Sequence, residues 1–249
     1  MADYRESRKS VESYVAWRMK REKPIVSKID KIQKLHGAKI LEIGCGYGAL
    51  MSLFAESGAK VTGVEIDEPS LEIARKRLKG NKNAKIVKGH GEKLAFDDMS
   101  FDIVVLFDVI EHVGDPIAMM REVVRVLKPD GILYCEFTPY YSLAGHHLYD
   151  ISKLPIHILP ERYIKKLVYR SKVSGIFNTD EYWADYMSLN KLRISRFQKS
   201  VSDLVVIEEN YIFKYPDVFE IRIPFLAYFG PLKDVFAMSF EGFYRKKER

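Results

Sequence analysis

A short apolar strand that stops at a glycine-rich turn limits what the rest of this chain can fold into. Residues 39–48 read Lys-Ile-Leu-Glu-Ile-Gly-Cys-Gly-Tyr-Gly. Such a run is typical of a buried parallel strand whose chain turns at once into a helix. Gly44, Gly46 and Gly48 let a ligand approach the backbone closely, and the free N–H groups of a helix over 49–56 point back at the turn. The run predicts the first half of a nucleotide-binding βαβ unit.

The spacing of these glycines separates two classes of ligand. Dinucleotide-binding folds favour G-x-G-x-x-G, because the pyrophosphate sits on the helix N-terminus, whereas here the third glycine comes one residue earlier. Glu42, two residues before the first glycine, would repel a phosphate but attract an ammonium group. Both features disfavour a nicotinamide-dependent oxidoreductase. Residues 41–48 instead resemble motif I of the class I S-adenosylmethionine-dependent methyltransferases.

An acid also stands at the end of the next expected strand. Residues 60–65 read Lys-Val-Thr-Gly-Val-Glu, which predicts a second parallel strand that ends at Glu65. In nucleotide-binding βαβ units an acid about 20 residues beyond the first glycine accepts hydrogen bonds from a ribose. We therefore expect Glu65 to bind the ribose of a cofactor.

A third block extends the resemblance. Residues 100–108 form an almost continuous apolar run, which predicts a central strand buried on both faces. They are followed by Asp-Val-Ile-Glu-His-Val at 108–113 and Arg-Val-Leu-Lys-Pro-Asp-Gly at 125–131. Both sequences resemble the same methyltransferase family in order and spacing, so the resemblance covers roughly residues 39–138.

The resemblance implies an α/β, Rossmann-like class I methyltransferase fold. It has a seven-stranded, mostly parallel sheet with helices on both faces and an antiparallel last strand. We expect one methyltransferase domain over residues 1–249, and Pro24 divides its N-terminal part into two helices. Its parts are N-terminal helices at 1–36, a cofactor-binding core at 37–175, a helical insertion or lid at 176–203 and C-terminal strands at 204–249.

The resemblance also implies the cofactor, S-adenosylmethionine, with S-adenosylhomocysteine as product. Glu42 then lies near the amino-acid end of the cofactor. Where this chain has His90, the family usually has an aspartate that accepts a hydrogen bond from the adenine amino group. Either neutral His90 or the nearby backbone makes that contact here, or His90 only caps its loop. Tyr14 and Trp17 pack the first helix on the core, or alternatively Tyr14 or Arg18 lies near the methionine carboxylate. The full set of expected cofactor residues is Glu42, Gly44, Cys45, Gly46, Glu65, Ile66, His90, Gly91, Glu92, Phe107 and Asp108.

Aromatic residues and histidines gather in residues 138–163, after the fifth expected strand. Open α/β sheets bind their ligands at this edge, so the segment predicts an acceptor site. The candidate catalytic residues are Asp108, His112, His146 and His147.

A divalent metal site is an open alternative around the fourth strand. In a helical turn Asp108, Glu111 and His112 share one face, and their oxygens and imidazole suit Mg²⁺, Mn²⁺ or Fe²⁺. The arrangement resembles the acid-x-x-Glu-His motif of ubiquinone-pathway O-methyltransferases and of small-RNA 2′-O-methyltransferases. In the RNA enzymes a downstream histidine completes the site, and His146, His147 or His157 could take that part here. We favour no metal, with His112 as a base or a packed helix start.

Composition places few further limits. The chain has 40 Lys and Arg against 34 Asp and Glu, a net charge of +6 that permits an anionic partner. Cys45 and Cys135 read as buried thiols in a reducing compartment, and no apolar run approaches membrane-spanning length. We therefore expect a cytoplasmic O- or N-methyltransferase with a small-molecule acceptor. An RNA methyltransferase and a non-catalytic methyltransferase-like subunit are the alternatives, and the oligomeric state does not follow from the sequence.

Overall fold

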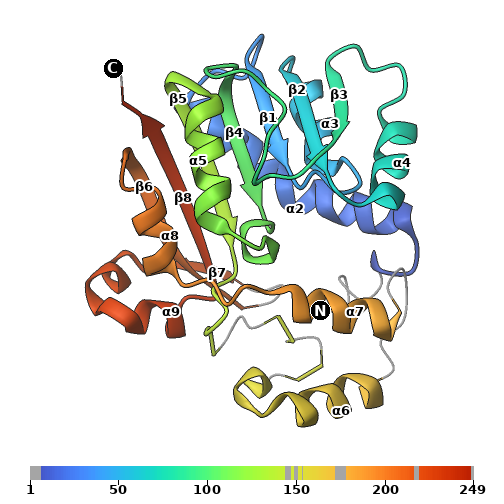
Figure 1. Cartoon of the computed structure of the whole chain (residues 1–249), viewed down its shortest axis with the longest axis vertical. Coiled ribbons are helices and arrows are strands. Elements are labelled where there is room, and N and C mark those ends of the chain that lie inside the picture. Colours follow the sequence, from blue (N-terminus) through green and yellow to red (C-terminus); the bar gives the residue numbers. More distant parts are fainter. Residues whose placement is uncertain are drawn as a thin grey trace.

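One mixed eight-stranded sheet organises the chain (Figure 1). The structure is a computed structural model that describes residues 7–143, 147–148, 151–152, 154–171, 178–215 and 219–247. The strand order is β3-β2-β1-β4-β5-β8-β6-β7. The strands are β1 Lys39–Ile43, β2 Lys60–Glu65, β3 Ala84–Lys88, β4 Phe101–Phe107, β5 Leu127–Phe137, β6 Leu204–Tyr215, β7 Phe219–Arg222 and β8 Ser239–Lys246.

The first five strands run parallel, and the last three join them in antiparallel pairs. The last strand, β8, is antiparallel to both neighbours, as predicted. The predicted count of seven strands is wrong by one. The additional strand is β7, which runs antiparallel to the end of β6, from Ile212 opposite Arg222 to Tyr215 opposite Phe219.

Helices cover both faces of the sheet. The α-helices are α2 Val11–Ile32, α3 Ala49–Glu56, α4 Glu68–Arg77, α5 Pro116–Val126, α6 Glu161–Ser171, α7 Thr179–Ser188, α8 Ile194–Ser200 and α9 Lys233–Phe236. The 3₁₀ helices of the described residues are η1 Ile110–His112, η2 Ile156–Ile158 and η3 Pro224–Leu232. Buried side chains of α2 and α3 pack with β1 and β4 in one core cluster, and those of α5 and α8 form a second. The fold is therefore the predicted three-layer α/β arrangement.

The N-terminal segment differs from the prediction of two helices, because α2 continues through Pro24. A proline inside a helix removes one backbone hydrogen bond. Here Ile25, Val26 and Ile29 follow it directly and are buried in the core cluster that α3 shares. This apolar burial keeps the helix continuous despite the missing bond.

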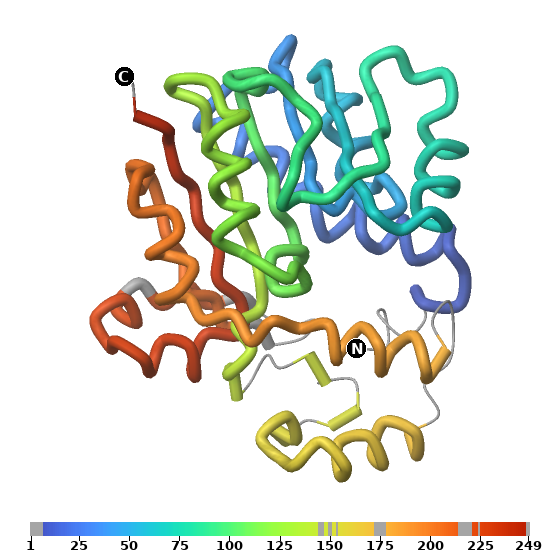
Figure 2. Tube along the Cα trace, viewed as in Figure 1, coloured from blue at the N-terminus to red at the C-terminus, as the bar shows by residue number. Residues whose placement is uncertain are grey.

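A third, smaller core cluster lies beyond the carboxyl ends of the parallel strands. Ile164 and Val168 of α6 pack there with Tyr186 of α7. Figure 2 shows α7 passing below the ends of the central strands, with α6 farther out. The part of the expected insertion that the structure describes thus contains α7 and α8.

Candidate functional site

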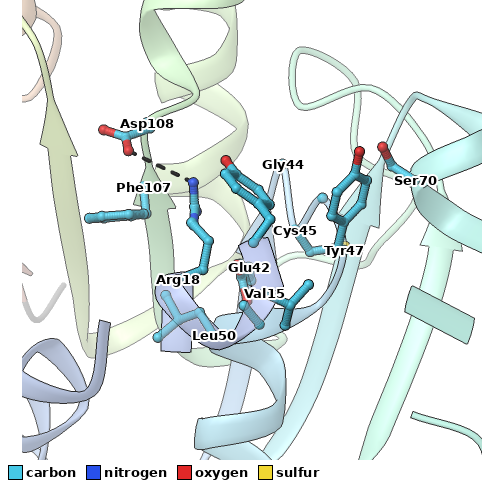
Figure 3. Close-up of a pocket in the computed structure, with 13 residues that line it drawn as sticks. Val15, Arg18, Glu42, Gly44, Cys45, Tyr47, Leu50, Ser70, Phe107 and Asp108 are labelled. Carbon is cyan, nitrogen blue, oxygen red and sulfur yellow. Dashed lines mark ion pairs between the residues drawn. The ribbon is translucent and has the colours of Figure 1, made fainter. Parts of the chain in front are cut away.

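The glycine turn after β1 forms the centre of the site, as Figure 3 shows. Gly44, Gly46 and Gly48 have φ angles of +74°, +49° and +75°, a region that L side chains rarely adopt. A Cβ added at Gly44 would lie 2.5 Å from Cγ2 of Val109, whereas one at Gly46 would have no atom of another described residue, apart from its chain neighbours, within 4 Å. Gly44 is therefore needed for packing as well as for its backbone angle, and Gly46 leaves open space beside the turn.

A first cavity opens beside this turn, and a buried acid forms part of its wall. Glu42 is only 3% exposed, and its Oε2 atom is buried with no hydrogen-bond partner among the residues that the structure describes. Burial raises the pKa of Glu42 well above its usual value, and Glu22 adds to this while Arg18 opposes it. An unsatisfied buried oxygen is costly, so a bound ammonium or hydroxyl donor would stabilise this wall. The lining residues are Tyr14, Val15, Arg18, Glu42, Gly44, Cys45, Gly46, Tyr47, Ala49, Leu50, Ser70, Phe107 and Asp108.

Two arginines of α2 reach the end of β4. The Arg21 Nη2 atom lies 2.5 Å from Oδ2 of Asp108, and the Arg18 Nη1 atom lies 3.9 Å from the same oxygen. Both guanidinium groups stand over the Phe107 ring, 5.0 Å from its centroid for Arg18 and 4.7 Å for Arg21. Arg18 also pairs with the buried Glu22. The first cavity thus offers a cation and a buried acid, which together match a zwitterionic amino-acid group.

Tyr14 packs against other aromatic rings and also lines the first cavity, and its expected place near the methionine carboxylate stays a prediction. Its ring lies 5.9 Å from that of Trp17 and 5.9 Å from that of Tyr47, and it also lines the first cavity. Arg18 lines the same cavity. The helix therefore packs on the core and contributes to the site at once.

A second cavity, of about 540 Å³, shares Gly44 and Asp108 with the first. Glu65 lies on its wall and is held by three backbone donors: Gly46 N to Oε2 at 2.9 Å, Ile66 N to Oε1 at 2.8 Å and Asp67 N to Oε1 at 3.0 Å. The lining residues are Ile43, Gly44, Val64, Glu65, Ile66, Gly89, His90, Gly91, Glu92, Asp108, Val109, His112, Val113, Gly114, Met119, Asp185 and Ser188.

Every residue expected to contact the cofactor lines one of these cavities. Glu42, Gly44, Cys45, Gly46, Phe107 and Asp108 line the first, and Glu65, Ile66, His90, Gly91 and Glu92 line the second. The structure thus gathers these residues along one edge of the sheet. Their contacts with a cofactor stay predictions.

His112 lies on the wall of the second cavity and faces α7. Its Nδ1 atom is 2.9 Å from Oγ of Ser188 and 3.5 Å from Oδ1 of Asp185. The ring of His147 packs edge-on against it, with the centroids 6.0 Å apart, and Nε2 of His147 lies 3.3 Å from the Thr138 carbonyl oxygen. Burial and the neighbouring His112 lower the pKa of His147 to about 4, so this ring is neutral.

The other two histidines of this region take no described part in the cavities. His146 lies outside the described residues. His157 belongs to η2, where its ring packs edge-on against Tyr140 at 5.8 Å, and burial lowers its pKa.

The three candidate metal ligands have separate partners. Asp108 has a φ of +51° and pairs with Arg21, while His112 faces α7. Glu111 is buried and accepts a long hydrogen bond of 3.4 Å from Thr138 N, and burial, followed by the nearby Asp108, raises its pKa well above the usual value. A 3₁₀ turn forms here instead of the α-helical turn that would align the three. Among the described residues no group of three His, Cys, Asp or Glu is placed to hold a metal ion.

Sequence reasoning missed the residues that fasten α7 to the site. The Asn190 side chain donates through Nδ2 to the carbonyl oxygens of Ile110 and Val113, both at 2.8 Å. Its backbone N–H donates to the Glu111 carbonyl oxygen at 2.8 Å. Three hydrogen bonds from Asn190 thus hold the turn that carries His112. No motif marks Asn190, Asp185 or Ser188, because each is more than 70 residues from its partner in the chain.

Comparisons with known proteins agree with this architecture. Residues 41–135 match a family model described as a methyltransferase domain. The chain is 33% identical over 117 residues to a ubiquinone biosynthesis O-methyltransferase of Actinobacillus pleuropneumoniae, covering 43% of this chain and 50% of that protein. It is 38% identical over 117 residues to a demethylmenaquinone methyltransferase of Clavibacter sepedonicus, covering 45% and 48%. The chain thus spans about half the length of the curated relatives it matches.

Solved structures share the fold over most of the chain. The PH0226 protein of Pyrococcus horikoshii aligns over 96% of this chain and 93% of its own, with a TM-score of 0.57 and 22% identity. A protein of Galdieria sulphuraria, provisionally described as a sarcosine dimethylglycine methyltransferase, aligns over 91% of this chain and 86% of its own. Its TM-score is 0.60 and its identity is 15%. The [4+2]-cyclase SpnF also shares the fold, with a TM-score of 0.59, 15% identity and coverage of 91% and 81%. Residues 41–135 are thus similar to a methyltransferase domain, and the solved structures share the fold of most of the chain.

Proposed function

We propose that the chain transfers a methyl group from S-adenosylmethionine to an oxygen or nitrogen of a small-molecule acceptor. The observation that carries the proposal is the buried Oε2 of Glu42, in a cavity beside the glycine turn, for which the described part of the chain provides no hydrogen-bond partner. This cavity shares two lining residues with a second one, which Glu65 and His112 border. When bound, S-adenosylmethionine supplies a methyl group that its sulfonium makes electrophilic.

The residues of the first cavity fit the amino-acid part of this cofactor. Glu42 binds the ammonium group, which satisfies the buried carboxylate, and Arg18 attracts the carboxylate of the ligand. Glu65, whose oxygens are already oriented by three N–H groups, accepts from the ribose hydroxyls. His90 and the backbone at Gly91 and Glu92 contact the adenine.

The second cavity also provides a candidate base. Nδ1 of His112 faces Ser188 and Asp185, so Nε2 is the nitrogen that takes the acceptor proton. The nearby carboxylate of Asp185 stabilises the imidazolium that forms. The neutral His147 packed against the ring limits its motion.

The names of the curated relatives suggest which acceptors to test first. They are a ubiquinone biosynthesis O-methyltransferase and a demethylmenaquinone methyltransferase. Quinone precursors therefore head the list of small-molecule acceptors that we propose, and the SpnF neighbour shows that the fold alone does not fix the reaction.

Calorimetric titration with S-adenosylhomocysteine and with NAD tests the cofactor part of the proposal. We expect binding of the first only, and a loss of about 1.5–3 kcal/mol in Glu42→Gln, the range for a hydrogen bond to a charged group. Glu72→Gln, on the exposed side of α4, is the control and should bind normally. Binding of NAD, or equal affinity in Glu42→Gln, would contradict the assignment.

A methyl-transfer screen with mass detection tests the reaction itself. Quinone precursors, other small phenols and amines, and RNA are offered as acceptors. Transfer to a small molecule that His112→Ala abolishes without changing S-adenosylhomocysteine affinity supports the proposal. Cofactor binding without transfer to any class would leave a non-catalytic subunit, and transfer to RNA alone would replace the proposed acceptor.

A further inference from the structure

Two exposed apolar segments project from one end of the molecule. The first, which we call the η3–α9 tip, is residues 224–236, and its first nine residues carry no charged side chain. Tyr228 at its centre is 90% exposed. The second, the α6 face, is residues 154–169, which include η2 and most of α6. The exposed large apolar side chains are Phe225, Tyr228, Phe229, Leu232 and Phe236 on the tip, and Leu154, Ile158, Leu159, Tyr163, Leu167 and Tyr169 on the α6 face.

Both segments lie at the edge of the sheet where the cavities are. The η3–α9 tip leads into β8, whose Phe240 pairs with Phe137, the last residue of β5. The α6 face belongs to the small cluster that α6 shares with α7, and Asp185 and Ser188 of α7 line the second cavity. Figure 1 shows α6 and α9 at the same lower end of the molecule, beyond the ends of the central strands.

Cations accompany this apolar surface. The exposed residues of α6 include Arg162, Lys165, Lys166 and Arg170, against one acid, Glu161. Residues 191–199, which lead from α7 into α8, add Lys191, Arg193, Arg196 and Lys199 and contain no acid. Aromatic and leucine side chains beside Lys and Arg on one helix are typical of segments that lie in a bilayer interface.

We propose that this end of the molecule docks on an anionic lipid bilayer. The η3–α9 tip inserts its aromatic rings at the boundary between headgroups and acyl chains, and the α6 face lies along the headgroups with its cations on the phosphates. No helix in the described part of the chain is long and apolar enough to cross a membrane. Docking places the second cavity next to the lipid, where an apolar acceptor would be concentrated.

The composition of the surface favours lipid over a protein partner. Lysine is depleted in the cores of protein–protein interfaces, whereas α6 places Lys165 and Lys166 directly beside its exposed apolar residues. A second copy of this chain would bring the same cations together, and like charges repel. An anionic bilayer supplies both an apolar phase and the complementary charge.

Co-sedimentation with lipid vesicles tests the docking and does not depend on methyl transfer. The full chain is mixed with phosphatidylcholine vesicles and with vesicles that also contain phosphatidylglycerol. We expect binding to the anionic vesicles that weakens as salt rises. Each of Lys166→Gln and Arg170→Gln should lower the partition coefficient about fivefold, and each of Phe225→Ser and Tyr228→Ser on the order of tenfold.

Matched controls come from the end of the sheet where the parallel strands begin, away from the proposed docking surface. Val206→Ser removes a large apolar side chain that is 54% exposed, near the start of β6, and Lys82→Gln removes an exposed cation just before β3. Both should leave vesicle binding unchanged. S-adenosylhomocysteine affinity and the unfolding midpoint, measured on every variant, separate failure of docking from failure of the cofactor site or of folding.

Three results would overturn the docking proposal. They are no binding to anionic vesicles, equal losses in the control variants, and a concentration-dependent dimer that Tyr228→Ser abolishes in the absence of lipid. The last would assign the η3–α9 tip to a contact between two copies of this chain.

Discussion

Asn190 offers the sharpest test of how the site is held together. In Asn190→Ala the carbonyl oxygens of Ile110 and Val113 lose their 2.8 Å hydrogen bonds, and the backbone bond to Glu111 remains. Two hydrogen bonds at a net 0.5–1.5 kcal/mol each give an expected loss of about 1–3 kcal/mol in the free energy of unfolding. Because the freed turn carries His112, we also expect a lower kcat with unchanged S-adenosylhomocysteine affinity.

The control for this variant lies at the other end of α7. Asn178 caps the helix by accepting from Glu181 N, so Asn178→Ala costs about 1 kcal/mol without touching the turn. Denaturant unfolding gives the stability of both variants, and steady-state kinetics gives kcat. Asn190→Ala with the stability and kcat of the unchanged protein would refute the reasoning. An equal fall in kcat for Asn178→Ala would show that general loosening of α7 is enough.

The remaining predictions concern the cofactor cavities. Glu65→Ala should weaken S-adenosylhomocysteine binding by about 1.5–3 kcal/mol in calorimetry, and a change within error would leave Glu65 as a support for the turn only. Gly44→Ala should lower the thermal unfolding midpoint, because its Cβ meets Val109 and its positive φ costs about 1–2 kcal/mol. Gly46→Ala has the same kind of strain but open space, so a smaller loss of stability with a clear loss of affinity is expected, and the reverse order would contradict the geometry. The raised pKa of Glu42 means that the free protein holds a proton there at pH values above the unfolded pKa. The contribution of neutral Glu42 to the free energy of unfolding is therefore largest at low pH and falls as the pH rises from the unfolded to the folded pKa. Binding of an ammonium group favours the ionised carboxylate, so it releases the proton. Titrations in buffers of different ionisation enthalpy should therefore show proton release that Glu42→Gln abolishes, and buffer-independent enthalpies would contradict it.

The cofactor edge of the sheet could be predicted because its determinants are local. An apolar run, glycines at fixed spacing and an acid at the end of the next strand are encoded within a few dozen residues. Parallel strands then bring their carboxyl ends to one edge. The lining of both cavities by the expected residues follows from this arrangement. The spacing of the glycines only disfavoured a dinucleotide as ligand. The expectation of S-adenosylmethionine came from the family resemblance.

The contacts that hold α2 and α7 against the turn after β4 were decided by tertiary structure. The pairing of Arg21 with Asp108 joins residues 87 positions apart, and the bond from Asn190 to Ile110 spans 80. Neither is visible in a local pattern, because each depends on where a helix packs after the sheet has formed. The same applies to Pro24, where burial of the following residues outweighs a local helix breaker. The sequence by itself thus determined the buried parallel strands of the core and the glycine turn after the first of them, through short-range periodicity and backbone preference. The packing of α2 and α7 on the sheet decided which charges and amides surround Asp108 and His112, since contacts between distant segments depend on shape and burial across the whole fold.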